Sequence, residues 1–243
     1  MNYKINFLSK VIFQANYQPI PQLRLGIEPK LSDFISGIIG FQPVISQNQT
    51  MTFEVKPGSS SSLVTKELQW NYQGNPIQVK LNSQWFQVIT LKYTNFNEFH
   101  PIICKIVCEF ESIYKPLFNR IALRYINNII FKEGNTFDFN EYIEDTLTGF
   151  STKFKNNNLK RSMGSVEIRN DETNVSTKFI FGFLNKSYPN TIFQREFVLD
   201  YDSFTLFDHT KDKMIDILQK LRLNVNDLFE SSIKEGLRTE MNK

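Results

Sequence analysis

The stretch from Phe118 to Lys132, FNRIALRYINNIIFK, alternates apolar and polar side chains with a period of two. This spacing is typical of a β-strand with one buried face, and it predicts a strand over Arg120–Lys132. The apolar face carries Ile121, Leu123, Tyr125, Ile129 and Phe131, interrupted by Asn127. The opposite face carries Ala122, Arg124, Ile126, Asn128, Ile130 and Lys132. The strand therefore contributes to the core on one side and presents a mixed surface on the other.

Arg124 is the residue of this strand that most needs a partner. It lies between Leu123 and Ile126, and an arginine in apolar surroundings is costly unless it is paired. We expect Arg124 to be ion-paired with a carboxylate or bonded to carbonyl groups, as structural scaffolding. The alternative, which the pattern leaves open, is that Arg124, Tyr125 and Asn128 belong to a surface that faces a ligand.

The first half of the chain predicts a strand, a helix, four strands and a long helix. Their ranges are Lys10–Tyr17, Lys30–Ile39, Gln49–Val55, Glu67–Tyr72, Pro76–Leu81, Gln84–Lys92 and Asn97–Lys115, in that order. Pro29 and Gly40 mark the two ends of the first helix. The long helix follows from apolar residues at helical spacing, and Pro116 ends it.

The second half predicts the same order of elements after the strand at Arg120–Lys132. The expected elements are a short helix at Asn140–Asp145, strands at Thr148–Phe154, Ser162–Ile168, Val175–Leu184 and Thr191–Asp200, and helices at Thr210–Arg222 and Asn224–Thr239. Most connections between strands are too short for a parallel crossover, so the strands are expected to be antiparallel.

These elements predict an α+β fold made of two pseudo-repeats, each reading strand, helix, four strands, helix. The first pseudo-repeat covers residues 1–117 and the second covers 118–243, packed as one globular unit. Because the long helices have one apolar stripe each, they are expected to cover one face of a curved antiparallel sheet. The other face of the sheet is then open.

The motif RIALRYINNI resembles the core strand of a sporadically distributed family of uncharacterised bacterial proteins of similar length. That family carries the pattern R-x-x-L-R-Y-x-N, which Arg120, Leu123, Arg124, Tyr125 and Asn127 match. The resemblance implies a bacterial, cytosolic setting and a mobile or defence-related role, and it supplies no catalytic residues. The element order is similar to the topology of the TATA-binding-protein-like fold, which directs attention to the sheet face away from the helices.

Composition agrees with a folded, cytoplasmic protein. Aromatic residues make up 14% of the 243 residues, which argues against disorder because such a chain can bury enough apolar surface to offset its ordering entropy. The net charge of +3 permits a nucleic-acid partner without requiring one. The sequence has neither the features of a signal peptide nor an apolar run long enough to span a membrane, so no membrane partner is expected.

Reactive residues give little support for catalysis or metal binding. His100, Cys104 and Cys108 lie at i, i+4 and i+8 of the long predicted helix, but a zinc site would still need a fourth ligand, such as His209 or an acid. Two cysteines beside apolar neighbours are better explained as buried thiols. No pair of acids shows the opposed environments that acid–base catalysis needs, and no glycine-rich phosphate loop occurs. We therefore expect no catalytic residues, no metal and no cofactor.

The remaining candidates are binding residues. They are Arg120, Arg124, Tyr125, Asn127 and Asn128 on the central strand, Trp85 as an aromatic anchor, and Lys153, Lys155, Lys160 and Arg161 in an expected cationic loop. A solvated loop explains the four basic residues equally simply. The sequence favours a non-enzymatic cytosolic binding protein that holds a protein partner encoded in the same operon. The alternatives are a nucleic-acid-binding saddle and, third, a small-molecule-binding or hydrolytic protein.

Overall fold

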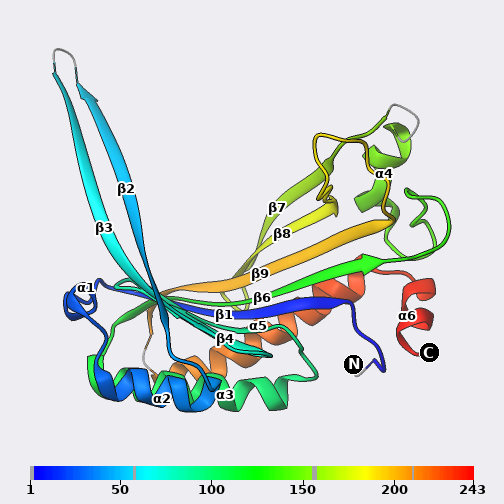
Figure 1. The fold of residues 1–243 in the computed structure, drawn as a ribbon. Helices are drawn as coiled ribbons and strands as arrows, with labels where there is room; N and C mark the ends of the chain where they lie inside the picture. The colour runs from blue at the N-terminus through cyan, green and yellow to red at the C-terminus, as the bar shows by residue number, and fades with distance from the viewer. Residues whose placement is uncertain (1–2, 57–58, 155–157, 210) are drawn as a thin grey trace.

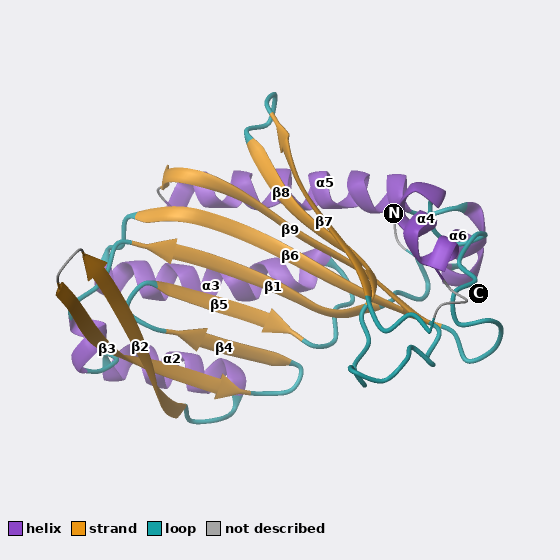
Figure 2. Cartoon of the chain, turned by 90° about the horizontal axis from the view of Figure 1, so that it is seen from above, coloured by secondary structure: helices purple, strands orange, loops and turns teal. Residues whose placement is uncertain are grey.

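The computed structural model describes residues 3–56, 59–154, 158–209 and 211–243. Over these residues the chain forms an open antiparallel sheet of nine strands with six helices (Figures 1 and 2). The strands are β1 (Leu8–Tyr17), β2 (Val44–Lys56), β3 (Ser59–Gln73), β4 (Ile77–Leu81), β5 (Trp85–Thr90), β6 (Phe118–Ile130), β7 (Ser162–Asn170), β8 (Val175–Phe183) and β9 (Glu196–His209). The predicted α+β class and antiparallel pairing are confirmed.

The strands lie in the order β2-β3-β4-β5-β1-β6-β9-β8-β7. β1 and β6, which come from the two halves of the chain, pair at the centre, with Phe13 opposite Leu123. Three helices lie beneath the sheet on one face: α2 (Pro29–Ile39), α3 (Phe96–Tyr114) and α5 (Lys211–Ser232) (Figure 1). The shorter helices are α1 (Gln22–Leu25), α4 (Asp145–Phe154) and α6 (Glu235–Met241).

The sheet is strongly twisted, and its outer strands rise away from the helices. In Figure 1 the β2–β3 hairpin stands up on one side of the central strands, and β7 and β8 rise on the other. Figure 2, which looks down on the sheet, shows no helix covering the face opposite α2, α3 and α5. The open face is therefore a shallow trough between two raised flanks.

The core lies between this sheet and the helices. Alternate β6 residues point into it, so Ile121, Leu123 and Ile129 are fully buried while Ile130 is exposed. Phe86, Phe110 and Phe118 pack against one another in the first half, and Phe139, Phe183 and Phe197 do so in the second. The two faces predicted for the central strand are confirmed.

Helix ends in the first half also follow the sequence. Pro29 is the first residue of α2, and Gly40 ends it with a φ of 81°, a left-handed conformation that glycine adopts without strain. The Asn95 side chain caps α3 by accepting a hydrogen bond from the Glu98 backbone N–H. Among the described helices, none combines the length and the apolar composition needed to cross a membrane.

The second half departs from the prediction near residue 150. The expected strand Thr148–Phe154 lies in helix α4, where Ser151 and Thr152 donate hydrogen bonds to the Thr148 carbonyl. β-Branched threonines suggested a strand, but contacts with β7 and β8 favour the helix. The expected helix Asn140–Asp145 is a turn region. The described second half therefore has four strands including β6, rather than five.

Three further boundaries differ. Helix α5 continues through the predicted break at Leu223 to Ser232, because the segment around Asn224 contains no glycine or proline, and the second expected helix is divided between α5 and α6. β9 continues to His209, beyond the predicted end at Asp200. The β2–β3 hairpin is also longer than predicted, since β2 begins at Val44 and β3 begins at Ser59. Backbone hydrogen bonds extend this hairpin without an apolar pattern.

Candidate binding surface

The open face is centred on an ion pair between neighbouring strands β6 and β9. Arg124 donates two hydrogen bonds to Asp200, from Nε to Oδ1 at 2.8 Å and from Nη2 to Oδ2 at 2.6 Å. The side chains are 39% and 10% exposed, respectively. The hydrogen bonds to Asp200 raise the pKa of Arg124. The expected carboxylate partner of Arg124 is therefore present.

A second ion pair lies beside the first. Arg120 Nη2 donates to Asp202 Oδ2 at 2.9 Å, and the Arg120 guanidinium lies 4.6 Å from the centre of the Phe204 ring. Arg120 and Arg124 are four residues apart on β6, and Asp202 and Asp200 are two apart on β9, so all four side chains share one face. The positive charge of both arginines is compensated within the sheet.

Amide side chains extend this face across the first half. Gln87 on β5 donates to Gln14 on β1 at 2.7 Å, and Gln14 donates to Asn16 at 2.7 Å. On β3, Gln69 donates to Asn71 at 2.6 Å. These hydrogen bonds fix the orientation of the amides. Each amide carries two N–H donors and one acceptor oxygen, so a single hydrogen bond does not use all of its groups.

Trp85 lies in the same layer. It is directly opposite Asn16 on β1, and Asn16 is opposite Arg120 on β6. Directly opposed residues of antiparallel strands point to the same side of the sheet. Trp85 is partly exposed and thus adds an aromatic surface to the polar row.

The candidate residues from the sequence divide into three groups. Arg120, Arg124, Asn128 and Trp85 lie on the open face. Tyr125 and Asn127 lie on the opposite face, where both are buried and line a pocket beside the helices. Lys153, Lys160 and Arg161 are exposed near the end of α4 and the start of β7, while Lys155 lies outside the described residues.

The basic cluster is therefore not a loop between two strands, as was expected, because Lys153 belongs to a helix. Arg161 lies 5.8 Å from the centre of the Tyr188 ring, and Lys153 lies 5.6 Å from that of Phe154. Neither contact joins these cations to Arg120 or Arg124. The sequence correctly placed the two arginines together but grouped them with residues from other surfaces.

The sequence analysis missed the carboxylates and amides that complete the face. Asp200 and Asp202 lie two residues apart on β9 and Arg120 and Arg124 lie four apart on β6, so both even spacings put each pair on one face of its strand. The glutamines and asparagines carry no motif. Only the strand register brings them side by side.

The residues of α3 considered for metal binding have a structural explanation. His100 Nε2 lies 3.4 Å from Cys104 Sγ. Burial lowers the pKa of His100 and raises that of Cys104, so both groups are neutral at pH 7. Over the described part of the chain, no group of three or more histidine, cysteine or acidic residues is arranged to hold a metal ion.

Comparison with known proteins gave no match to any family model and none to any curated protein sequence. The family resemblance carried by the motif from Arg120 to Asn127 stays a prediction.

Proposed function

We propose that this chain is a non-enzymatic cytosolic binding protein that holds another protein on the open face of its sheet. The observation that carries the proposal is the internal pairing of Arg120 with Asp202 and of Arg124 with Asp200. A surface that binds nucleic acid needs cations free to contact phosphates. The two central arginines of this face are already neutralised, and the amide groups and Trp85 lie beside them together with the separate lysines Lys80 and Lys178.

Such a surface suits a polypeptide. The partly exposed amides of Gln14 and Gln87 can donate to and accept from the main chain or polar side chains of a partner. Trp85 supplies the kind of large, partly exposed side chain that contributes most to protein–protein affinity. The raised flanks on either side of the trough allow a partner to be contacted from three directions (Figure 1).

We also propose that the two halves of the sheet are related, as in the TATA-binding-protein-like fold. From the central pair outwards, one side reads β1, β5, β4, β3, β2 and the other reads β6, β9, β8, β7. In chain order, helix α4 directly precedes β7, just as β2, the outermost strand of the first half, directly precedes β3. An experimental structure in which β1, β5, β4 and β3 fail to superpose on β6, β9, β8 and β7 would contradict this relation.

The proposed function is tested with two aromatic substitutions. Trp85→Ala removes the aromatic group of the open face, and Phe150→Ala removes one that is 80% exposed on α4, away from that face. A partner is first captured from a bacterial lysate with and without nuclease, purified, and titrated against the wild type and both variants. Trp85→Ala should weaken binding at least about tenfold, and Phe150→Ala should leave it unchanged.

Two outcomes would contradict the proposal. One is equal loss of affinity in the two variants, which would place the partner elsewhere. The other is a partner that nuclease treatment removes, which would favour the nucleic-acid saddle instead. Thermal melting of both variants controls for a folding defect.

A further inference from the structure

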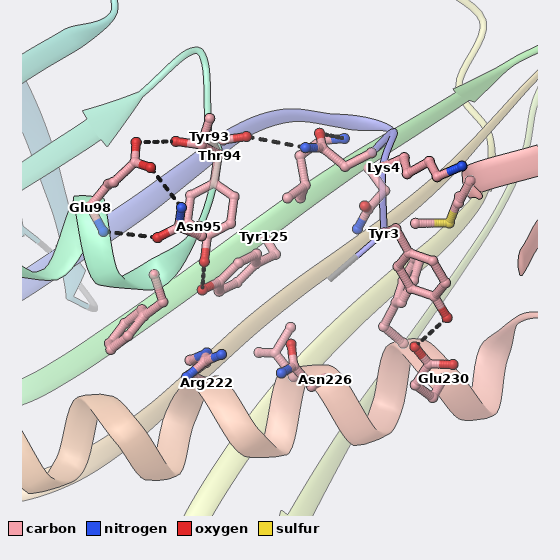
Figure 3. A pocket seen from close by; sticks show the side chains of 17 residues that line it. Tyr3, Lys4, Tyr93, Thr94, Asn95, Glu98, Tyr125, Arg222, Asn226 and Glu230 are labelled. Atoms are coloured by element: carbon pink, nitrogen blue, oxygen red, sulfur yellow. Dashed lines mark hydrogen bonds between the residues drawn. The ribbon is translucent and has the colours of Figure 1, made fainter. Parts of the chain in front are cut away.

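A pocket of about 430 Å³ lies on the helix side of the sheet (Figure 3). The ion pairs of Arg120 and Arg124 lie on the opposite, open face. The pocket is bounded by the N-terminal segment, the loop that leads into α3, strand β6 and helix α5. This volume is within the range of sites that hold small organic molecules.

Arg222 is the partly buried cation of this pocket, and Lys4, which is exposed, is the second basic residue of its lining. Arg222 is half-buried on α5, and its guanidinium lies 5.1 Å from the centre of the Phe96 ring. Among the described residues, none makes a hydrogen bond or an ion pair with it. A half-buried guanidinium with its donors unused is rare unless an anion completes the site.

The two acids of the pocket are already engaged with other groups. Glu98 accepts hydrogen bonds from Thr94 and from Asn95. Glu230 accepts one from the Tyr3 hydroxyl at 2.7 Å and one from Arg238 at 3.1 Å. Neither carboxylate compensates Arg222.

Further donors lie beside Arg222. The hydroxyl oxygens of Tyr93 and Tyr125 are 3.2 Å apart, so one O–H donates to the other and the second proton stays free to donate. Burial raises the pKa of both tyrosines, which keeps both hydroxyls protonated at neutral pH. Asn226, one turn after Arg222 on α5, points into the same space (Figure 3).

Apolar and polar side chains share the remainder of the lining. Val225 and Met241 are buried, and Phe229 and Leu8 are partly exposed. Lys4, Asn6 and Asn127 lie among them, so Arg222 and the tyrosine hydroxyls adjoin the apolar side chains of a mixed wall. This arrangement fits a ligand with one charged head and an apolar body.

We propose that this pocket binds a small organic monocarboxylate, with its carboxylate on Arg222 and its apolar body against Val225, Phe229 and Met241. The planar guanidinium matches a carboxylate with two parallel hydrogen bonds. Glu98 and Glu230 offset the charges of Arg222 and Lys4, so the lining lacks the excess of positive charge that a ligand with several negative charges, such as a nucleotide, needs. This site goes beyond the proposed protein-binding function and does not depend on it.

The test uses matched probes and calorimetric titration. The probes are 3-phenylpropionate, octanoate and benzoate, and the neutral control is 3-phenylpropanamide, which keeps the shape of the first probe without its charge. At least one carboxylate should bind with a dissociation constant below about 1 mM, and 3-phenylpropionate should bind at least about tenfold more tightly than its amide.

Three variants locate the binding. Arg222→Gln should lower the affinity for the carboxylate at least about tenfold and bring it to that of the amide. Tyr93→Phe, which removes one hydroxyl from a partly buried ring, should lower it severalfold. Arg169→Gln, which changes an arginine that is exposed on β7, should have no effect.

The proposal would be overturned if no probe bound within this range or if carboxylate and amide bound equally. It would also be overturned if Arg222→Gln kept the wild-type preference for the carboxylate. Since Tyr93→Phe leaves Arg222 in place, it reports on the site even if Arg222→Gln folds poorly.

Discussion

Arg124 and Asp200 show how a single residue pair organises the open face. Asp200 is 10% exposed, so a carboxylate without its partner would be poorly solvated there. Arg124 is 39% exposed and can reach solvent if Asp200 is changed. Substitution of Arg124 and substitution of Asp200 should therefore lower the free energy of unfolding by different amounts.

We predict that Arg124→Met lowers the free energy of unfolding by about 2 kcal/mol, between the values for exposed and for fully buried pairs. Asp200→Asn should cost about 1 kcal/mol, because Arg124 then turns to water. Urea denaturation of the wild type, both single variants and the double variant gives the coupling energy. A coupling below about 0.5 kcal/mol would mean that the pair does not stabilise the sheet.

Glu98 makes the stability of the α3 start depend on pH. Hydrogen bonds from Thr94 and Asn95 lower the pKa of Glu98 below its ordinary value of 4.5. Because the folded-state pKa is the lower one, this carboxylate stabilises the fold above pH 4.5, and the contribution is lost as the pH falls through the folded-state pKa.

We therefore predict that Glu98→Gln is less stable than the wild type at pH 7 and that the difference shrinks as the pH falls below 4.5 and disappears below the folded-state pKa of Glu98. Asn95→Ala should cost about 1 kcal/mol at pH 7 and less at low pH, because it removes both the cap of α3 and a hydrogen bond to the Glu98 carboxylate. Urea midpoints provide the comparison. A Glu98→Gln deficit that persisted below the folded-state pKa would refute the electrostatic explanation.

At the scale of elements, the attachment of edge strand β7 depends on one glycine. Gly182 on β8 has a φ of 131°, and a Cβ there would run into the backbone of Ser162 on β7. Only glycine adopts this conformation readily and leaves room for the neighbouring strand. Among the described strands, β7 pairs with β8 alone, and helix α4 is the other element that contacts it.

We predict that Gly182→Ala destabilises the protein by more than about 1 kcal/mol and increases hydrogen exchange in β7 before other strands. Gly149→Ala is the matched control, because a Cβ at this position of α4 meets no atom within 4 Å. Alanine in a helix should stabilise there by up to about 1 kcal/mol. Equal exchange in the two variants would show that Gly182 does not control the edge.

At the scale of the whole molecule, alternation and helical spacing predict the elements that contribute strongly apolar stripes, such as β6 and α3. They fail at α4, where Thr148 and Ser151 are the buried residues and tertiary packing decides the conformation. The binding face is predicted only in part, because adjacent residues of a strand point to opposite faces. Arg124 and Tyr125 are neighbours in the motif, but their side chains belong to opposite faces of the sheet.

The most direct test of protein binding on the open face is site-specific photocrosslinking in the native host. A benzophenone side chain is placed at Trp85 or Asn128 on the open face, or at Lys105, which is exposed on α3 beneath the sheet. The account predicts that the first two positions crosslink to the same protein and that Lys105 does not. Crosslinking to that protein from Lys105 with equal yield, or to nucleic acid alone from Trp85 and Asn128, would contradict it.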